Sequence, residues 1–179
     1  MNILVFGAQG SGKSTHAKYI ADKLKAPYIY TGDLFRELEK ERSQRGRLIK
    51  RLMRAGEIIP NEISIPALEE YLKDFDLSKG IVLDGYPRNT GQAESLPIKI
   101  DLIIRIKLSE EIAIERLSTR GRYDDTPQAI KMRLEMYKKE TQPVLNYFKE
   151  KGVKIISIDN TLPVNIVREN IDDLLKDIR

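Results

Sequence analysis

Residues 2–14 read NILVFGAQGSGKS, a short apolar run followed by a glycine-rich turn and the start of a helical pattern. The turn GAQGSGKS at 7–14 matches the pattern G-x-x-x-x-G-K-[ST] after an expected strand and before an expected helix. Its glycines allow consecutive backbone N–H groups to face an anion, and the helix that follows adds its positive end. We therefore expect this turn to bind nucleotide phosphates, through Gly10, Ser11, Gly12, Lys13, Ser14 and Thr15.

Two side chains near this turn are candidates for metal binding. The Ser14 hydroxyl is expected to coordinate Mg²⁺, while Lys13 reaches the β- and γ-phosphates. A second apolar run, residues 81–83, ends in Asp84, and a carboxylate at the end of a parallel strand faces phosphates bound there. Asp84 is thus the second candidate, and a structural turn aspartate before Gly85 is the alternative.

The apolar runs predict the fold class. They are short, rich in β-branched residues and bounded by turn residues, as buried strands are, and they lie at 2–6, 28–30, 81–83, 102–106 and 153–158. Helical patterns alternate with them, at 13–25, 61–74, 109–119, from Thr126-Pro127 onward and at 164–178. Pro143 is expected to kink or break the fourth of these helices. The alternation predicts an α/β fold, a parallel sheet with helices on both faces. Residues 36–51 are polar but rich in helix formers, so we expect them to be ordered.

Composition narrows the possible functions. A chain of 179 residues with 41% hydrophobic and 32% charged residues is typical of one globular domain, here 1–179. The absence of Cys excludes disulfides and zinc–thiolate sites, and one His excludes a multi-histidine metal site, so no structural zinc is expected. No leader pattern precedes the first run and no stretch reaches 18 apolar residues. We expect a cytoplasmic protein that does not bind membranes.

A phosphate-binding turn is shared by molecular switches, motors and small-molecule kinases. A GTP switch needs an N-K-x-D motif, which the sequence lacks, and a motor usually needs a longer chain. Two alternatives to a nucleotide kinase remain open. One is a P-loop kinase for sugar or shikimate-like acceptors, and the other is a non-enzymatic nucleotide-dependent module or an RNA-associated ATPase.

Six segments together resemble the adenylate kinase family, in its order and at its spacing. They are GAQGSGKST (7–15), TGDLFR (31–36), AGEIIP (55–60), LDGYPRNTGQA (83–93), ERLSTRGRYDD (115–125) and IKMRLEMY (130–137). The resemblance covers nearly the whole chain. It implies a P-loop NTPase-type five-stranded parallel sheet, a small helical insert that binds the nucleoside monophosphate at 31–60, and a minimal lid at 117–125. It also implies reversible phosphoryl transfer from MgATP to AMP, giving two ADP.

The resemblance further implies roles for individual residues. Arg116 is expected to stack on the ATP base. The transferred group is expected to be surrounded by Lys13, Arg88, Arg120, Arg122 and Arg133, since guanidinium groups stabilise the charge that develops there. AMP is expected to contact Thr31, Arg36, Glu57, Ile58, Ile59, Gly85, Arg88 and Gln92. Asp124 and Asp125 are expected to hinge the lid and orient its arginines. Outside this context, the arginines of 116–133 would be read as a solvated helix face.

The acceptor base is expected to be chosen by Thr31 and Gln92. The Gln92 amide can accept a hydrogen bond from the adenine amino group and donate one to the neighbouring ring nitrogen, so we expect AMP to be preferred about tenfold or more over UMP and CMP. A kinase that prefers UMP or CMP is the alternative. His16 is expected to pack within its helix, because a phosphate oxygen that attacks phosphorus needs no base at neutral pH.

The lid and the net charge complete the expectations. Gly121 alone separates Arg120 from Arg122, and we hypothesise that so short a lid excludes water less well and permits more ATP hydrolysis. The net charge is +4, and the six arginines of the expected site with Lys13 exceed it. We therefore expect no nucleic-acid partner. The expected partners are ATP, AMP and ADP, and the chain is expected to be a monomer.

Overall fold

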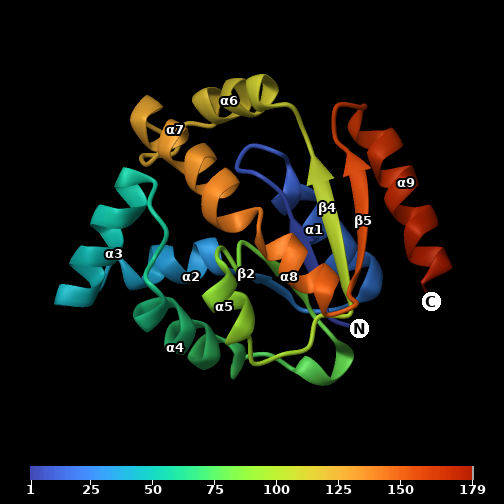
Figure 1. The fold of residues 1–179 in the computed structure, drawn as a ribbon, viewed down its shortest axis with the longest axis horizontal. Coiled ribbons are helices and arrows are strands. Elements are labelled where there is room, and N and C mark those ends of the chain that lie inside the picture. Colours follow the sequence, from blue (N-terminus) through green and yellow to red (C-terminus); the bar gives the residue numbers. More distant parts are fainter. Residues whose placement is uncertain (179) are drawn as a thin grey trace.

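The protein forms a five-stranded, wholly parallel sheet with helices on both faces (Figure 1). The computed structural model describes residues 1–178. The strands are β1 (Ile3–Phe6), β2 (Tyr28–Tyr30), β3 (Val82–Asp84), β4 (Leu102–Lys107) and β5 (Lys154–Asp159). Their order across the sheet is β2-β3-β1-β4-β5, which confirms the α/β, P-loop NTPase-type sheet that the apolar runs and the resemblance predict.

The helices connect and cover these strands. The α-helices are α1 (Lys13–Leu24), α2 (Thr31–Leu38), α3 (Gln44–Ala55), α4 (Asn61–Leu72), α5 (Thr90–Glu94), α6 (Glu110–Thr119), α7 (Pro127–Met136), α8 (Val144–Glu150) and α9 (Val164–Asp177). A 3₁₀ turn, η1, spans Leu77–Lys79, and a π-helical turn, η2, spans Tyr137–Thr141. Within residues 1–178, no helix is both long enough and apolar enough to cross a bilayer.

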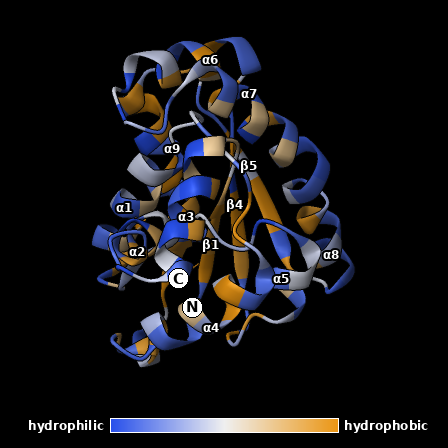
Figure 2. Cartoon of the chain, turned by 90° about the vertical axis from the view of Figure 1, so that its left-hand side faces the viewer, coloured by the Kyte–Doolittle hydropathy of each residue, from blue (hydrophilic) through white to orange (hydrophobic). Residues whose placement is uncertain are grey.

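Two hydrophobic layers enclose the sheet, and β1 shows how the sequence builds both. Side chains alternate across a strand, so Ile3 and Val5 face one layer while Leu4 and Phe6 face the other. The first layer contains residues from α1 and α9, and the second contains residues from α4 and α8. Figure 2 shows the resulting pattern, with hydrophobic strands inside and hydrophilic outer helix faces. This packing holds β1 rigidly at the centre of the sheet.

Residues 31–60 carry a small core of their own. Leu34 and Phe35 of α2 pack with Ile49 and Leu52 of α3. The turn between the two helices ends at Ser43, whose side chain accepts a hydrogen bond from the Gly46 N–H at 3.0 Å and so caps α3. The polar interval 36–51 is therefore ordered, as expected.

The helical stretch around Pro143 is broken into α7, η2 and α8, one of the two outcomes expected for this proline. The α-helical pattern of α7 ends at Met136, before the proline, and η2 follows with a bond from the Gln142 N–H to the Tyr137 carbonyl at 2.7 Å. Pro143 then stands directly before α8, where its missing N–H costs no helical bond. The change of hydrogen-bond pattern falls on the turn before the proline, where the proline ring crowds the carbonyl four residues earlier. The helix start expected at Thr126-Pro127 is confirmed, and the Thr126 side chain caps it by accepting from the Ala129 N–H at 3.2 Å.

Candidate active site

The phosphate loop joins the carboxyl end of the central strand β1 to α1. Gly10 and Gly12 have φ angles of +81° and +83°, in the left-handed region that only glycine enters at low cost. Gly12 also lies against Asn160, and a Cβ there would come within 2.4 Å of the Asn160 Nδ2. The first turn of α1 contains no acidic residue, so the positive end of its dipole is available to an anion. The loop has the geometry of an anion site.

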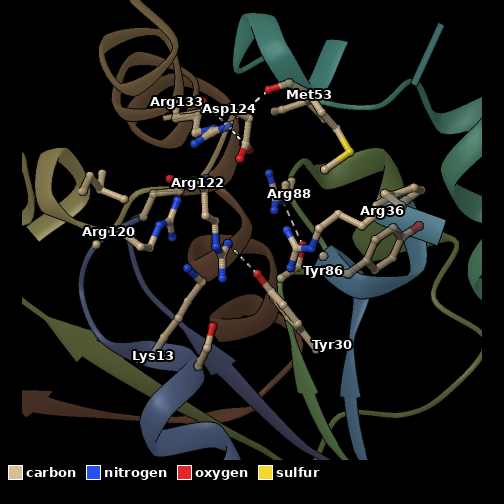
Figure 3. A pocket seen from close by; sticks show the side chains of 18 of the residues that line it. Lys13, Tyr30, Arg36, Met53, Tyr86, Arg88, Arg120, Arg122, Asp124 and Arg133 are labelled. Carbon is tan, nitrogen blue, oxygen red and sulfur yellow. Dashed lines mark hydrogen bonds and ion pairs between the residues drawn. The ribbon is translucent and has the colours of Figure 1, made fainter. Parts of the chain in front are cut away.

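A cleft of about 260 Å³ opens above this loop, between residues 31–60 and the segment that connects α6 to α7. It is lined by sixteen of the residues expected from the sequence. They are Gly10, Gly12, Lys13, Ser14, Thr15, Arg36, Glu57, Ile58, Ile59, Gly85, Arg88, Gln92, Arg116, Arg120, Arg122 and Arg133. Figure 3 shows the cationic side chains entering the cleft from separate elements. Residues far apart in the sequence therefore form one basic cavity.

Three expected residues do not line the cleft. Ser11 is buried within the loop, and its hydroxyl has no hydrogen-bond partner among residues 1–178. The Thr31 hydroxyl donates to the backbone carbonyl of Asp84 at 3.3 Å and is fully buried. Asp84 itself is buried behind the cleft surface. Thr31 thus connects α2 to the end of β3 in this structure.

Lys13 extends from the first turn of α1 into the cleft. Its Nζ donates to the Ala8 carbonyl at 3.4 Å, a contact that folds the lysine back over the loop. Burial lowers the pKa of Lys13, and the nearby charges of Asp84 and Tyr30 oppose that shift. An incoming phosphate would supply the strong anionic partner that this ammonium lacks.

The donor set near the loop suits Mg²⁺. The Oδ1 atom of Asp84 is buried and has no partner within the described chain, while Oδ2 accepts from the Tyr28 hydroxyl at 3.0 Å. The Ser14 hydroxyl lies on the cleft wall. No cluster of three or more His, Cys, Asp or Glu side chains that could hold a metal occurs in residues 1–178. One carboxylate and one hydroxyl fit an ion that keeps several waters and takes its other ligands from phosphates.

Asp125 bridges Arg120, in the expected lid, and Arg133 of α7. Its carboxylate accepts from Arg120 Nε and Nη2 at 2.7 and 2.6 Å, and from Arg133 Nη1 at 2.7 Å. Burial alone would raise the pKa of Asp125, but the bonds and charges of these two guanidinium groups outweigh burial and lower it. Asp124 forms a second ion pair with Arg133. Both acids are ion-paired with arginines of the cleft, whereas the expectation that they hinge the lid stays a prediction.

The remaining arginines are held by other partners. Arg88 Nε donates to the Gly85 carbonyl at 2.9 Å, and burial lowers the pKa of Arg88. Arg36 pairs with Asp33 at 3.0 Å. At the far end of the cleft, Arg116 Nη2 donates to the Asn160 carbonyl at 3.4 Å. Each guanidinium keeps further N–H groups for a ligand, since it carries five donors.

Gln92 is almost fully buried, and its amide already has three partners. Oε1 accepts from the Arg88 N–H at 2.7 Å, and Nε2 donates to Ser64 Oγ at 2.9 Å and to the Ile59 carbonyl at 3.3 Å. An amide has two N–H donors, so both are used, whereas Oε1 retains one lone pair. The side chain can therefore accept from a base amino group as it stands, but donating to a ring nitrogen requires it to release Ser64 or Ile59.

His16 lies outside the cleft. Its Nε2 contacts Asn160 Oδ1 at 2.8 Å, and because Asn160 Nδ2 donates to the Ser11 carbonyl at 2.7 Å, that Oδ1 must accept. Nε2 therefore carries the proton, and Nδ1 is buried without a partner among the described residues. Burial lowers the pKa of His16. The packing role expected for His16 is thus what the structure shows.

Several cleft residues were not singled out in the sequence. They are Gln9, Tyr30, Gly32, Phe35, Met53, Tyr86 and Leu117. Tyr30 had a detectable signal, because it ends an expected strand directly before Thr31 and therefore lies at the same sheet edge as Asp84.

The fold and this site define a P-loop kinase, with an anion loop at the centre of a parallel sheet and arginines on three sides of one cleft. The sequence model of the adenylate kinase family matches residues 5–153. The chain is 36% identical to adenylate kinase of Oenococcus oeni over 186 aligned positions, covering 99% of this chain and 98% of that relative. It is 36% identical to adenylate kinase 1 of Synechocystis sp. over 181 positions, covering 97% and 96%. It is 32% identical to adenylate kinase of Methanosarcina acetivorans over 212 positions, covering 98% of each chain. This chain belongs to the adenylate kinase family and is a nucleoside monophosphate kinase.

Proposed function

We propose that the reversible transfer of the γ-phosphoryl group from MgATP to AMP, which gives two ADP, takes place in this cleft. The observation that carries the proposal is the composition of the cleft wall. Six arginines and Lys13 line it, against the carboxylates of Glu57 and Asp124 alone. A cavity with this excess of cations suits several phosphates at once, as when two nucleotides meet tail to tail.

The donor end of the cleft is assigned to the phosphate loop. Backbone N–H groups of Gly10, Ser11, Gly12, Ser14 and Thr15 would hold the ATP phosphates, and Lys13 would reach the outer two. Ser11 and Thr15 would have to share or release the bonds that their N–H groups now make to the Ala8 and Gly12 carbonyls, at 3.2 and 3.1 Å. Ser14 and Asp84 would hold Mg²⁺, Asp84 in part through water, and the ion would neutralise charge on the phosphates. Arg116, whose Nη2 donates to the Asn160 carbonyl, would stack on the donor base.

The transfer step needs no protein nucleophile, because the acceptor phosphate attacks directly. The work of the chain is positioning and charge stabilisation. Arg88, Arg120, Arg122 and Arg133 would surround the moving phosphoryl group, and Lys13 would hold it from the donor side. The bridge from Asp125 keeps Arg120 and Arg133 in place before substrate arrives, so less of the binding free energy is spent on ordering them.

The acceptor end is assigned to residues 31–60 and to the end of β3. Arg36 and Arg88 would bind the AMP phosphate in bidentate fashion. Glu57, Ile58, Ile59 and Gly85 line the wall beside them, and Gln92 offers its free lone pair to the base amino group. Thr31 would act from behind the wall, through the Asp84 carbonyl. Residues 31–60 are thus proposed as the acceptor insert, and 117–125 as the lid.

We further propose that the enzyme is a cytoplasmic monomer whose partners are ATP, AMP and ADP. For the choice of partners, the support is the location of the charge. The cations of the cleft exceed the net charge of +4 for the whole chain, so no separate nucleic-acid surface is needed to account for it. Size-exclusion chromatography with light scattering tests the monomer directly.

The test of the function is an acceptor screen. ADP formation from MgATP is measured with AMP, CMP, UMP and GMP in turn, and kcat/KM for AMP is expected to exceed that for UMP and CMP about tenfold or more. Equal specificity constants would remove AMP as the particular acceptor. Transfer only to a sugar or another alcohol would point to a different small-molecule kinase.

Two lysine variants separate catalysis from folding. Lys13→Ala is expected to lower kcat by about 100-fold or more, with little change in Tm. Lys131→Ala is the matched control, because Lys131 is exposed on α7 and pairs only with Glu135. A loss of transfer in both variants would contradict the assignment of Lys13.

A further inference from the structure

Tyr30 lines the cleft, but none of the roles proposed for the cleft residues involves it. It is the last residue of β2, and its ring lies parallel to that of Tyr28, with 6.1 Å between centroids and 5° between planes. Gly32 makes room for it, because a Cβ at that position would come within 2.4 Å of the Tyr30 Cζ. The ring is therefore held firmly from two sides, and the position of its hydroxyl is fixed.

The Tyr30 hydroxyl lies among cations from three parts of the chain. Arg122 Nη1, in the lid, donates to it at 3.4 Å. Arg36, in the insert, lies with its guanidinium carbon 5.3 Å from the ring centroid and also interacts with the hydroxyl. Lys13 of the phosphate loop is close enough for its pKa to respond to Tyr30. Figure 3 shows Lys13, Tyr30 and Arg122 converging on one part of the cleft.

The proton of this hydroxyl is free to be donated. A phenol both donates and accepts, and here the oxygen accepts from guanidinium groups. No hydrogen bond from the Tyr30 O–H to another residue of 1–178 is present. Burial alone would raise the pKa of Tyr30, but bonds from Arg36 and Arg122 outweigh it and lower the pKa. A more acidic phenol is a stronger donor to an anion.

Packing alone does not account for the hydroxyl. A phenylalanine would stack on Tyr28, place its ring beside Gly32 and keep the contact between the ring and Arg36, so that only the oxygen, which also lies beside Gly32, would be lost. The oxygen adds a polar group at the point where Lys13, Arg36 of the insert and Arg122 of the lid come together. That point is where the assignments above place the transferred phosphoryl group.

We propose that Tyr30 is a further phosphate-binding residue of this cleft, and that its hydroxyl donates a hydrogen bond to a phosphoryl oxygen at the junction of the two nucleotides. The inference rests on the proposed function, because it needs both nucleotides in one cleft. Arg36 and Arg122 can contact phosphate and the Tyr30 oxygen together, since each guanidinium has five N–H donors. The bond would form only when the cleft holds the bridging phosphates.

The test is Tyr30→Phe in the full chain, with calorimetric binding of three ligands. The probes are ATP alone, AMP alone, and a linked mimic in which five phosphates join two adenosines. A lost bond to a charged group predicts that the mimic binds about tenfold more weakly, while each single nucleotide changes by less than about threefold. The same variant is expected to lower kcat about tenfold, with KM for each substrate within about threefold.

The control is Tyr147→Phe, which removes a hydroxyl from a ring that packs on Phe148 in α8, away from the cleft. It is expected to change none of these values. Unchanged mimic binding in Tyr30→Phe would overturn the inference while leaving the proposed function intact. Equal weakening of all three ligands with a lower Tm would also overturn it, because that is the result of a packing role. A wild-type enzyme that binds the mimic no better than ATP would instead contradict the two-nucleotide site itself.

Discussion

The hydroxyl of Tyr123 in the lid donates a hydrogen bond to the carboxylate of Glu39, which follows the last residue of α2. The guanidinium of Arg54 in α3 lies 5.6 Å from the Tyr123 ring centroid. Close by, Arg133 Nη2 donates to the Met53 carbonyl at 3.1 Å. Burial and the Glu39 charge raise the pKa of Tyr123, so the phenol remains a donor. The segment proposed as the lid is thus hydrogen-bonded to the segment proposed as the acceptor insert.

Loss of the hydrogen bond between Tyr123 and Glu39 should admit water to the cleft. Tyr123→Phe keeps the ring beside Arg54 but removes the bond to Glu39, and because Tyr123 is 49% exposed we expect a modest effect. ATP hydrolysis without AMP should rise about two- to fivefold relative to transfer. The measurement is ADP release from MgATP with and without AMP, and Tyr147→Phe again serves as the control. An unchanged ratio would show that this hydrogen bond does not control water access.

The length of the lid predicts a difference between relatives. Only Gly121 separates Arg120 from Arg122 in the segment proposed as the lid. We expect hydrolysis to be a larger fraction of transfer here than in an adenylate kinase with a longer lid, because a shorter lid excludes water less completely. Both rates are measured side by side under one set of conditions. An equal fraction in the two enzymes would show that the short lid is sufficient.

Asp125 should matter for rate and for stability together. The Asp125 side chain is almost fully buried and contacts the guanidinium groups of Arg120 and Arg133. In Asp125→Asn, the neutral amide cannot balance the charges of these two groups. We expect a loss of about 2–4 kcal/mol in the free energy of unfolding and a fall of about tenfold in kcat. Denaturant titration and steady-state kinetics provide both numbers. A variant of wild-type stability and rate would mean that the arginines are positioned without this bridge.

Protonation of His16 should make the free energy of unfolding depend on pH near neutrality. The folded pKa lies below the ordinary value because of burial, so between the two pKa values the unfolded chain binds more protons and stability falls as the pH falls. Below about pH 6.5, the free energy of unfolding should drop by up to about 1.4 kcal/mol per pH unit. Since this is the only histidine, His16→Gln should remove that component. Denaturant unfolding from about pH 5 to about pH 8 checks it, and parallel curves for the two proteins would contradict it.

The strands and the phosphate loop were predictable from local sequence, because a buried parallel strand and an anion loop each leave a contiguous pattern. The run ending in Asp84 shows this, since its apolar residues fix the strand and its last position fixes the edge. The arginines were placed only through resemblance to the adenylate kinase family. Nothing local distinguishes a cleft arginine such as Arg122 from a solvated one.

Tertiary partners account for what the sequence did not predict. The Gln92 amide is occupied by Ser64, 28 positions away, and the Thr31 hydroxyl by the Asp84 carbonyl, 53 positions away. The π-helical turn η2, which begins at Tyr137, contains no glycine or proline that would have predicted it. In the sequence, Tyr30 is marked only by its position at the end of a strand, and only the fold shows that Arg36 and Arg122 contact its hydroxyl.

The most direct test of the central claim is a crystal structure of the enzyme with the linked mimic bound. We predict that Lys13, Arg88 and Arg122 contact the bridging phosphates within hydrogen-bond distance, with one adenosine beside Arg116 and the other beside Gln92. Guanidinium groups turned to solvent, or a second adenosine left outside the cleft, would contradict the account.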